Sequence, residues 1–204
     1  YRKDLIDKAG VSEADLTRDW NSYIAAGKKI KAATGAYLLA DAADLRDIAL
    51  RIGLKDGEGI YFDKQGNTTV ESPRFVKAFE LGREVRVAGL DAKVVSWNNE
   101  WAAGFKQGKI ATQMMGAWLT GHLKNWLAPD SKGLWRSAML PGGLYASYGG
   151  SFYAIPKKAA NKAAAWDFVR FMTVNKETQL NSLRVLDTFP ALLEAHQDPI
   201  MDEP

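Results

Sequence analysis

Apolar residues recur at helical spacing in several stretches of this sequence, separated by turn residues. The clearest helix start is Ser72-Pro73, where a hydroxyl that can cap the helix precedes a proline in the first turn. Another helix would open after Thr17, with Trp20, Ile24 and Ile30 turned toward the core. The pattern predicts helices over 17–35, 72–89, 96–108 and 161–172, and a further one from about residue 175.

Short apolar segments lie between these helices and predict strands. One of them, Trp135 to Leu140, runs into the turn Pro141-Gly142-Gly143. The stretch 63–67 has the composition of a hairpin turn between 60–62 and 68–70. The other predicted strands are 37–39, 110–115 and 152–155. Helices that alternate with short strands indicate an α/β fold.

Three aromatic residues fall at successive fourth positions after Ser96, a candidate helix cap. Trp97, Trp101 and Phe105 would therefore share one face of the helix predicted there. For the two tryptophans we favour packing in the core over contact with a ligand.

The composition is that of a globular chain without cysteine. Apolar residues make up 47% and charged residues 25%, with a formal net charge of +3. The basic residues occur mostly as pairs, such as Lys28-Lys29 and Lys157-Lys158, and not as a stripe beside aromatics, which argues against a nucleic-acid partner. The absence of cysteine excludes disulfides and thiol nucleophiles.

No apolar run reaches the roughly 18 residues that a membrane span requires. The first residues, Tyr1 to Leu5, lack the apolar core of a signal peptide. We expect the sequence to be the interior of a longer protein whose signal peptide lies outside it.

Candidate catalytic residues are few. His122 and His196 have no neighbours at metal-ligand spacing, and neither a phosphate-binding loop nor a nucleophile elbow occurs. Asp41, Asp44 and Asp47 are spaced so that they would lie along one helical face, where a catalytic pair is possible. Such runs are more often solvated faces or helix caps. The residues therefore indicate no metal, no cofactor and no required catalytic centre.

Six segments, in order, look like parts of one known family. The most specific is Phe105-Lys106-Gln107-Gly108-Lys109, which continues to Gly116-Ala117-Trp118. The others are 1–10, 19–23 and 60–73, then Gly149-Gly150 with Ile155-Pro156-Lys157, and finally Ala165-Trp166-Asp167-Phe168. Together they resemble the extracellular solute-binding proteins of bacterial ABC sugar importers, the class that includes maltose-binding protein.

The resemblance implies a type II periplasmic-binding-protein lobe of the α/β class, with a mixed sheet flanked by helices. Residues 1–150 would form the C-terminal lobe. Residues 151–185 would be a hinge strand and helices that normally pack on an N-terminal lobe absent from this sequence, and 186–204 would return toward the C-terminal lobe.

The resemblance also implies a sugar site. Trp118 would be the stacking platform, and its alternative is a core tryptophan at the start of a helix. Asp41 follows the predicted strand 37–39. Ligands gather at the carboxyl ends of strands, so Asp41 is a candidate for contact with sugar hydroxyls, and the nearby Asp44 is a second candidate. Both have the alternative of capping a helix over 42–52. We further expect ligand contacts from the backbone of Gly149 and Gly150, which have the alternative of a simple turn, and from Tyr148 and Phe152.

The expected function is the capture of a carbohydrate in a cleft between two lobes and its delivery to an ABC permease, in the periplasm or at the cell surface on a lipid anchor. Two alternatives stay open: a glycan-acting hydrolase that uses Asp41 and Asp44, and a structural or interaction domain. We also expect this chain alone to bind sugar weakly and to self-associate, because Phe152, Ile155 and Phe168 would lack their usual partner.

Overall fold

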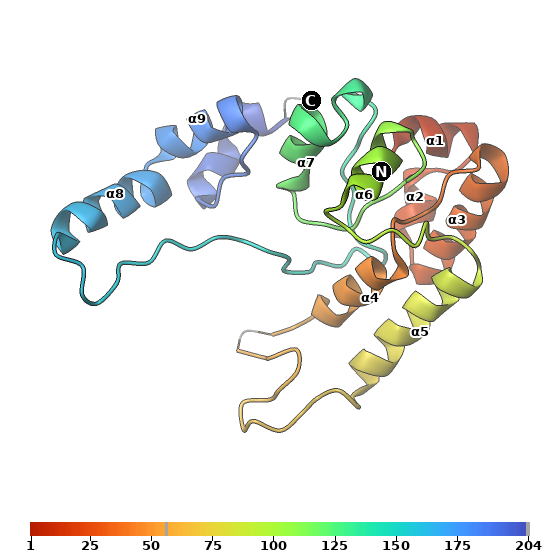
Figure 1. The fold of residues 1–204 in the computed structure, drawn as a ribbon, viewed down its shortest axis with the longest axis horizontal. Coiled ribbons are helices and arrows are strands. Elements are labelled where there is room, and N and C mark those ends of the chain that lie inside the picture. Colours follow the sequence, from red (N-terminus) through yellow and green to blue (C-terminus); the bar gives the residue numbers. More distant parts are fainter. Residues whose placement is uncertain (56, 203–204) are drawn as a thin grey trace. The chain divides into compact units, whose positions relative to one another are not determined.

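The computed structural model describes residues 1–55 and 57–202, which divide into two compact units. The first unit contains residues 1–116 and 123–148, and the second contains residues 117–122 and 149–204. Figure 1 follows the chain through both. The assignment of these parts to lobes stays a prediction.

Among its described residues, the first unit is built around six α-helices. Their starts are well capped: Ser12 and Asp15 form a capping box, and the side chain of Asp19 accepts a hydrogen bond from Ser22 N at 2.7 Å. Thr17 is therefore not the cap of the third helix. It lies inside the second, where its hydroxyl donates to Glu13 O. The helices are α1 (Lys3–Lys8), α2 (Glu13–Thr17), α3 (Trp20–Thr34), α4 (Ala42–Arg51), α5 (Pro73–Val87) and α6 (Asn99–Lys106).

Short extended segments meet between these helices. Tyr37 pairs with Ile110 and Leu39 with Asp91, both in parallel, so that 37–39 lies between the other two segments. Arg2 and Trp135 form an antiparallel bridge beside them. In the part of the chain that the structure describes these contacts are single bridges and not ladders, so the α/β character is present while the full mixed sheet stays a prediction.

Two other predicted strand regions had opposite outcomes. Phe62 and Thr68 form the expected hairpin bridge, and the Asp63 carboxylate closes the turn by accepting from the backbone of Gln65 and Asn67. The strand expected over 152–155 is not formed. The backbone of 152–155 is irregular, and Phe152 is 97% exposed. A strand forms only where its backbone can pair with a neighbouring strand.

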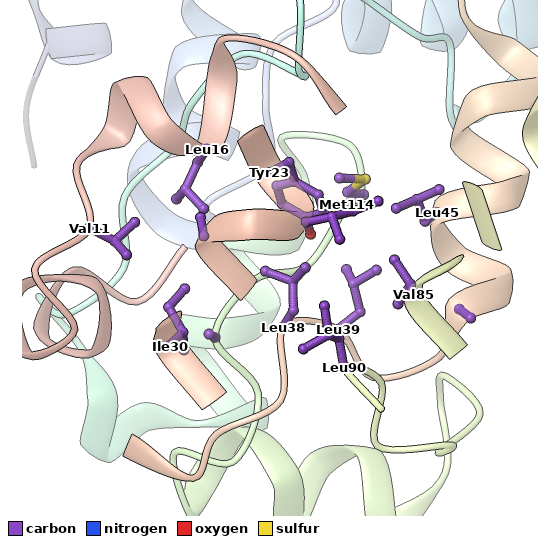
Figure 2. Close-up of a cluster of buried hydrophobic side chains, with 14 of the residues drawn as sticks. Val11, Leu16, Tyr23, Ile30, Leu38, Leu39, Leu45, Val85, Leu90 and Met114 are labelled. Atoms are coloured by element: carbon purple, nitrogen blue, oxygen red, sulfur yellow. The ribbon is translucent and has the colours of Figure 1, made fainter. Parts of the chain in front are cut away.

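The core of the first unit lies where α3 and α4 cover the extended segments. Figure 2 shows Tyr23 and Ile30 of α3 in the same buried cluster as Leu38 and Leu90. The helix and the segment approach closely because position 27 is glycine. A Cβ there would lie 2.5 Å from Leu38 Cδ2. Helix α4 packs along α5 (Figure 1).

The aromatic face predicted over 97–105 is only partly formed. Helix α6 starts at Asn99, capped by the Asn98 side chain at 2.8 Å from Trp101 N. Trp101 is buried as predicted, and Phe105 is buried beside it, but the prediction of a core position for Trp97 was wrong. Trp97 precedes the cap, has a φ of 74°, and is 51% exposed.

The second unit holds the remaining α-helices and much less buried surface. It contains α7 (Leu119–His122), α8 (Lys162–Val174) and α9 (Lys176–Leu186), followed by the 3-10 turns η3 (Leu193–Gln197) and η4 (Pro199–Asp202). The helices expected from 161 and 175 are confirmed, and Asn175 caps the second of them. No residue of α8 is buried. After α7 the chain rejoins the first unit in the π-helical turn η1 (Leu123–Leu127) and the 3-10 turn η2 (Pro129–Ser131).

Candidate functional site

Trp118 stands directly before α7 in the second unit and is partly exposed. Its ring makes an edge-to-face contact with His122, with the centroids 5.7 Å apart. The backbone of Gly149 approaches the indole, since a Cβ on Gly149 would lie 3.2 Å from Trp118 Nε1. Gly149 and Gly150 have φ values of 79° and 105°, which only glycine adopts readily. The structure therefore brings Trp118 and Gly149 together on one indole edge.

The aromatic residues on either side of these glycines have different surroundings. Phe152 is almost fully exposed in the second unit. Tyr148 belongs to the first unit, where it packs partly buried against the core. The guanidinium of Arg51 lies 5.0 Å above the Tyr148 ring. A ring with one covered face keeps less surface for a ligand than Phe152 does.

For Asp41 the helix-cap alternative is confirmed. Its carboxylate accepts from Ala43 N at 2.7 Å and caps α4. The same carboxylate accepts from Arg86 Nη2 at 3.1 Å, and Arg86 Nε also pairs with the buried Asp91 at 2.7 Å. Asp41 thus joins α4 to the end of α5. A role in ligand binding stays a prediction for it.

Asp44 is not a cap, and it has a polar environment of its own in the first turn of α4. Gln113 Nε2 donates to its carboxylate at 3.0 Å, and the Ser96 hydroxyl donates at 3.3 Å. Burial raises the pKa of Asp44 above its usual range, and these two hydrogen bonds partly oppose that shift. The side chain is nevertheless partly exposed. A half-buried carboxylate with fixed neighbours is well suited to accept hydroxyl groups.

Two of these neighbours were not singled out from the sequence as ligand-binding candidates. Gln113 follows the extended segment at Ile110 just as Asp41 follows the segment at Tyr37, so the rule about carboxyl ends of strands could have found it. Ser96 carries no such signal. It reaches Asp44 only because the chain turns back before α6.

The three carboxylates of α4 and its cap have separate partners. Asp47 pairs with Arg46 at 2.7 Å, Asp41 with Arg86, and Asp44 with Gln113 and Ser96.

The histidines lie in different settings. His122 faces Trp118, and His196 Nε2 contacts Pro190 O at 2.8 Å. Over residues 1–55 and 57–202 no group of histidines and carboxylates could hold a metal ion. Within the same ranges, no helix is both long and apolar enough to cross a membrane.

Comparison with known proteins identifies the class of this α/β chain. Residues 1–204 match the family described as bacterial extracellular solute-binding protein, so the chain belongs to that family. A lactose-binding protein of Rhizobium radiobacter is 31% identical over 178 residues, which cover 83% of this chain and 41% of that protein.

Solved structures agree on the fold. An extracellular solute-binding protein of family 1 superimposes with a TM-score of 0.77 at 26% identity, covering 98% of this chain and 51% of its own. A transporter-associated binding protein of B. animalis subsp. lactis Bl-04, in complex with β-1,6-galactobiose, gives 0.74 at 25% identity, with 98% and 50% covered. The chain thus spans about half the length of these proteins. The family is one of binding proteins, so the hydrolase alternative is not favoured.

Proposed function

We propose that the protein containing this chain captures an oligosaccharide and delivers it to the permease of a bacterial ABC importer, outside the cytoplasm. The observation that carries the proposal is the Trp118 indole, which is partly exposed and closely approached by the Gly149 backbone. Sugars present patches of C–H that stack on aromatic faces, and hydroxyls that bind planar polar groups. Family membership and the lactose-binding relative support the same function.

Both units contain residues that are candidate sugar contacts. The second unit offers Trp118, the backbone of Gly149 and Gly150, and the exposed ring of Phe152. The first unit offers the carboxylate of Asp44, with Asp41 and Tyr148 as lesser candidates. The ligand class is a short oligosaccharide, with galactosides and arabinooligosaccharides as the first to test, after the names of the relatives.

Titration calorimetry on the full-length protein tests the proposal with lactose, galactobiose and arabinooligosaccharides. Trp118→Ala should weaken binding of the preferred sugar by about tenfold to a hundredfold, the effect of losing an aromatic anchor. Trp166→Ala is the matched control, because Trp166 is an exposed tryptophan of α8 that no part of the proposed site uses. Turnover of any sugar, or equal affinity for Trp118→Ala and the wild-type protein, would contradict the proposal.

The periplasmic or lipid-anchored location and the permease partner belong to the same proposal. Deleting the gene should abolish uptake of the sugar that the protein binds. Expression of the Trp118→Ala variant in the deletion strain should recover uptake only at raised sugar concentration. Uptake that is unaffected by the deletion would separate this protein from import.

A further inference from the structure

Trp97 has a backbone conformation that is unusual for its residue type. Its φ of 74° lies in the left-handed region, which bulky side chains rarely adopt. Residues held there cost stability and cluster at ligand sites, so such an outlier requires a reason. The turn at Trp97 delivers Asn98 to the cap of α6 and leaves the indole 51% exposed. A glycine would make the same turn without strain.

The ring of Trp97 rests on a rigid support. Its centroid lies 4.9 Å from that of Trp101, with the planes tilted by 47°. Trp101 is fully buried and packs edge-to-face on Phe105, with the centroids also 4.9 Å apart. The exposed indole is thus fixed from below by a core aromatic, as a stacking platform should be.

A chain of hydrogen bonds connects the same two tryptophans to Asp44. Trp101 Nε1 donates to Gln113 Oε1 at 3.3 Å, which fixes the amide so that its Nε2 donates to Asp44. The hydroxyl of Ser96, the residue before Trp97, shares its one hydrogen between the two carboxylate oxygens of Asp44. An ionised carboxylate has about four acceptor positions, so Asp44 keeps capacity for hydroxyl donors.

We infer that Trp97 and Asp44 form a pyranose subsite in the first unit, in which Trp97 determines specificity. The indole takes the C–H face of one sugar ring, and the Asp44 carboxylate accepts hydrogen bonds from hydroxyls of that ring. Ser96 and Gln113 position the carboxylate. The inference rests on the proposed function and deepens it, because it requires a ligand with a pyranose unit that exposes one face and neighbouring hydroxyls.

The test uses the full-length protein and the preferred sugar of the wild-type protein, with calorimetry as the readout. Trp97→Ala should weaken binding by about tenfold or more, and Trp97→Phe should recover most of the affinity because it keeps an aromatic face. Asp44→Asn should weaken binding because it replaces an ionised acceptor. The matched control is Trp126→Ala in η1 of the same unit, since Trp126 is 50% exposed and belongs to neither proposed set of contacts.

A second readout separates a binding role from a merely structural one. Trp97→Gly should raise the Tm of the ligand-free protein, because glycine adopts the left-handed turn without strain, and should still lower sugar affinity. A purely structural tryptophan would lose Tm on the same change, and that result would overturn the inference.

The outcomes also distinguish this inference from the function on which it rests. If the wild-type protein binds sugar and Trp118→Ala weakens binding, while Trp97→Ala and Asp44→Asn bind as tightly as the wild-type protein, the subsite is wrong and the function stands. If the wild-type protein binds no sugar in the panel, both fall. If Trp97→Ala leaves sugar affinity intact and lowers transport alone, the exposed indole is a contact for the permease, and the subsite is overturned.

Discussion

The two units bury their apolar side chains to very different extents. In the first unit, core residues such as Ile30, Leu38 and Phe105 have no exposed surface. In the second, α8 has no buried residue, and the aromatic residues Trp166 and Phe171 are each 55% exposed. The two regions have similar fractions of apolar residues in the sequence. The difference in burial therefore comes from how much surface each unit has to pack against.

This contrast indicates that the first unit carries the stability of the chain. Burial of apolar area is the main favourable term in folding, and the first unit holds a large cluster of buried apolar residues. The apolar residues of the second unit are spaced as one side of a larger core would be, and exposed surface of this kind recruits partners. Self-association of this chain through Phe152 and Phe168 stays a prediction, which sedimentation velocity at tens of micromolar would test.

The largest expected effect comes from a matched pair of phenylalanines. Phe105→Ala should lower the free energy of unfolding by about 3–5 kcal/mol, because the ring is fully buried between Trp101 and Trp135. Phe168→Ala should cost less than about 1 kcal/mol, because Phe168 is 55% exposed and its ring contact is with Tyr153. Urea denaturation of both variants measures the difference. Equal losses would show that the second unit has a core of its own.

A smaller effect is expected from the ion pairs that join α4 to α5. Arg86→Ala should cost about 2 kcal/mol, because it leaves the carboxylate of Asp91 buried with Ala42 N as its remaining donor. Arg86→Ala with Asp91→Asn should recover part of the loss, since no buried charge then remains. Denaturation at low and high salt provides the measurement. Wild-type stability in the single variant would mean that water reaches Asp91.

A third prediction concerns a close contact inside the second unit. A Cβ on Gly121 of α7 would lie 2.8 Å from Asp187 Cβ and 3.0 Å from Asp187 O, at the end of α9. Gly121→Ala should therefore separate these helices and cost about 1 kcal/mol or more, although alanine alone favours a helix. Hydrogen exchange should show faster exchange at the end of α9 and an unchanged first unit. Slower exchange there would contradict the crowding.

Much of the fold could be predicted from the sequence, since local signals placed most helices within a few residues. Helix α5 begins at Pro73 as predicted, although the Ser72 side chain makes no capping hydrogen bond. Asn175 caps α9, and the turn at 63–67 closes a hairpin. Each of these features depends on residues that are close together in the chain, so the sequence alone can indicate it. The strand expected at 152–155 failed because pairing requires a partner strand, which no local pattern can provide.

The candidate site was predictable only in part, for the same reason. Trp118 and Gly149 were named separately, and the structure brings them together. Trp97 was assigned to the core because spacing alone extends the helix back through it, whereas Asn98 is the N-cap and α6 begins only at Asn99. The contact between Gln113 and Asp44 joins positions far apart in the sequence, and it exists because their segments lie in parallel.

The smallest expected effect distinguishes, within the stable unit, residues that serve stability from those that serve binding. Burial raises the pKa of Asp44, so the folded chain holds this proton more readily than the unfolded chain does. Ionised Asp44 therefore lowers stability at neutral pH, and this cost disappears as the pH falls through the raised pKa. Asp44→Asn should be slightly more stable than the wild-type protein at pH 7, and the difference should vanish near pH 3, about where both states are protonated.

Asp63→Asn is the control with the opposite sign, because the hydrogen bond from the Asn67 side chain lowers the pKa of Asp63. The Asp63 carboxylate stabilises the hairpin above its unfolded pKa, so Asp63→Asn should be less stable at pH 7, with the loss shrinking in acid. Urea denaturation of both variants across this pH range measures the two trends. If Asp44→Asn loses stability at pH 7 as Asp63→Asn does, Asp44 is a structural residue and not one kept for ligand binding at a cost to the fold.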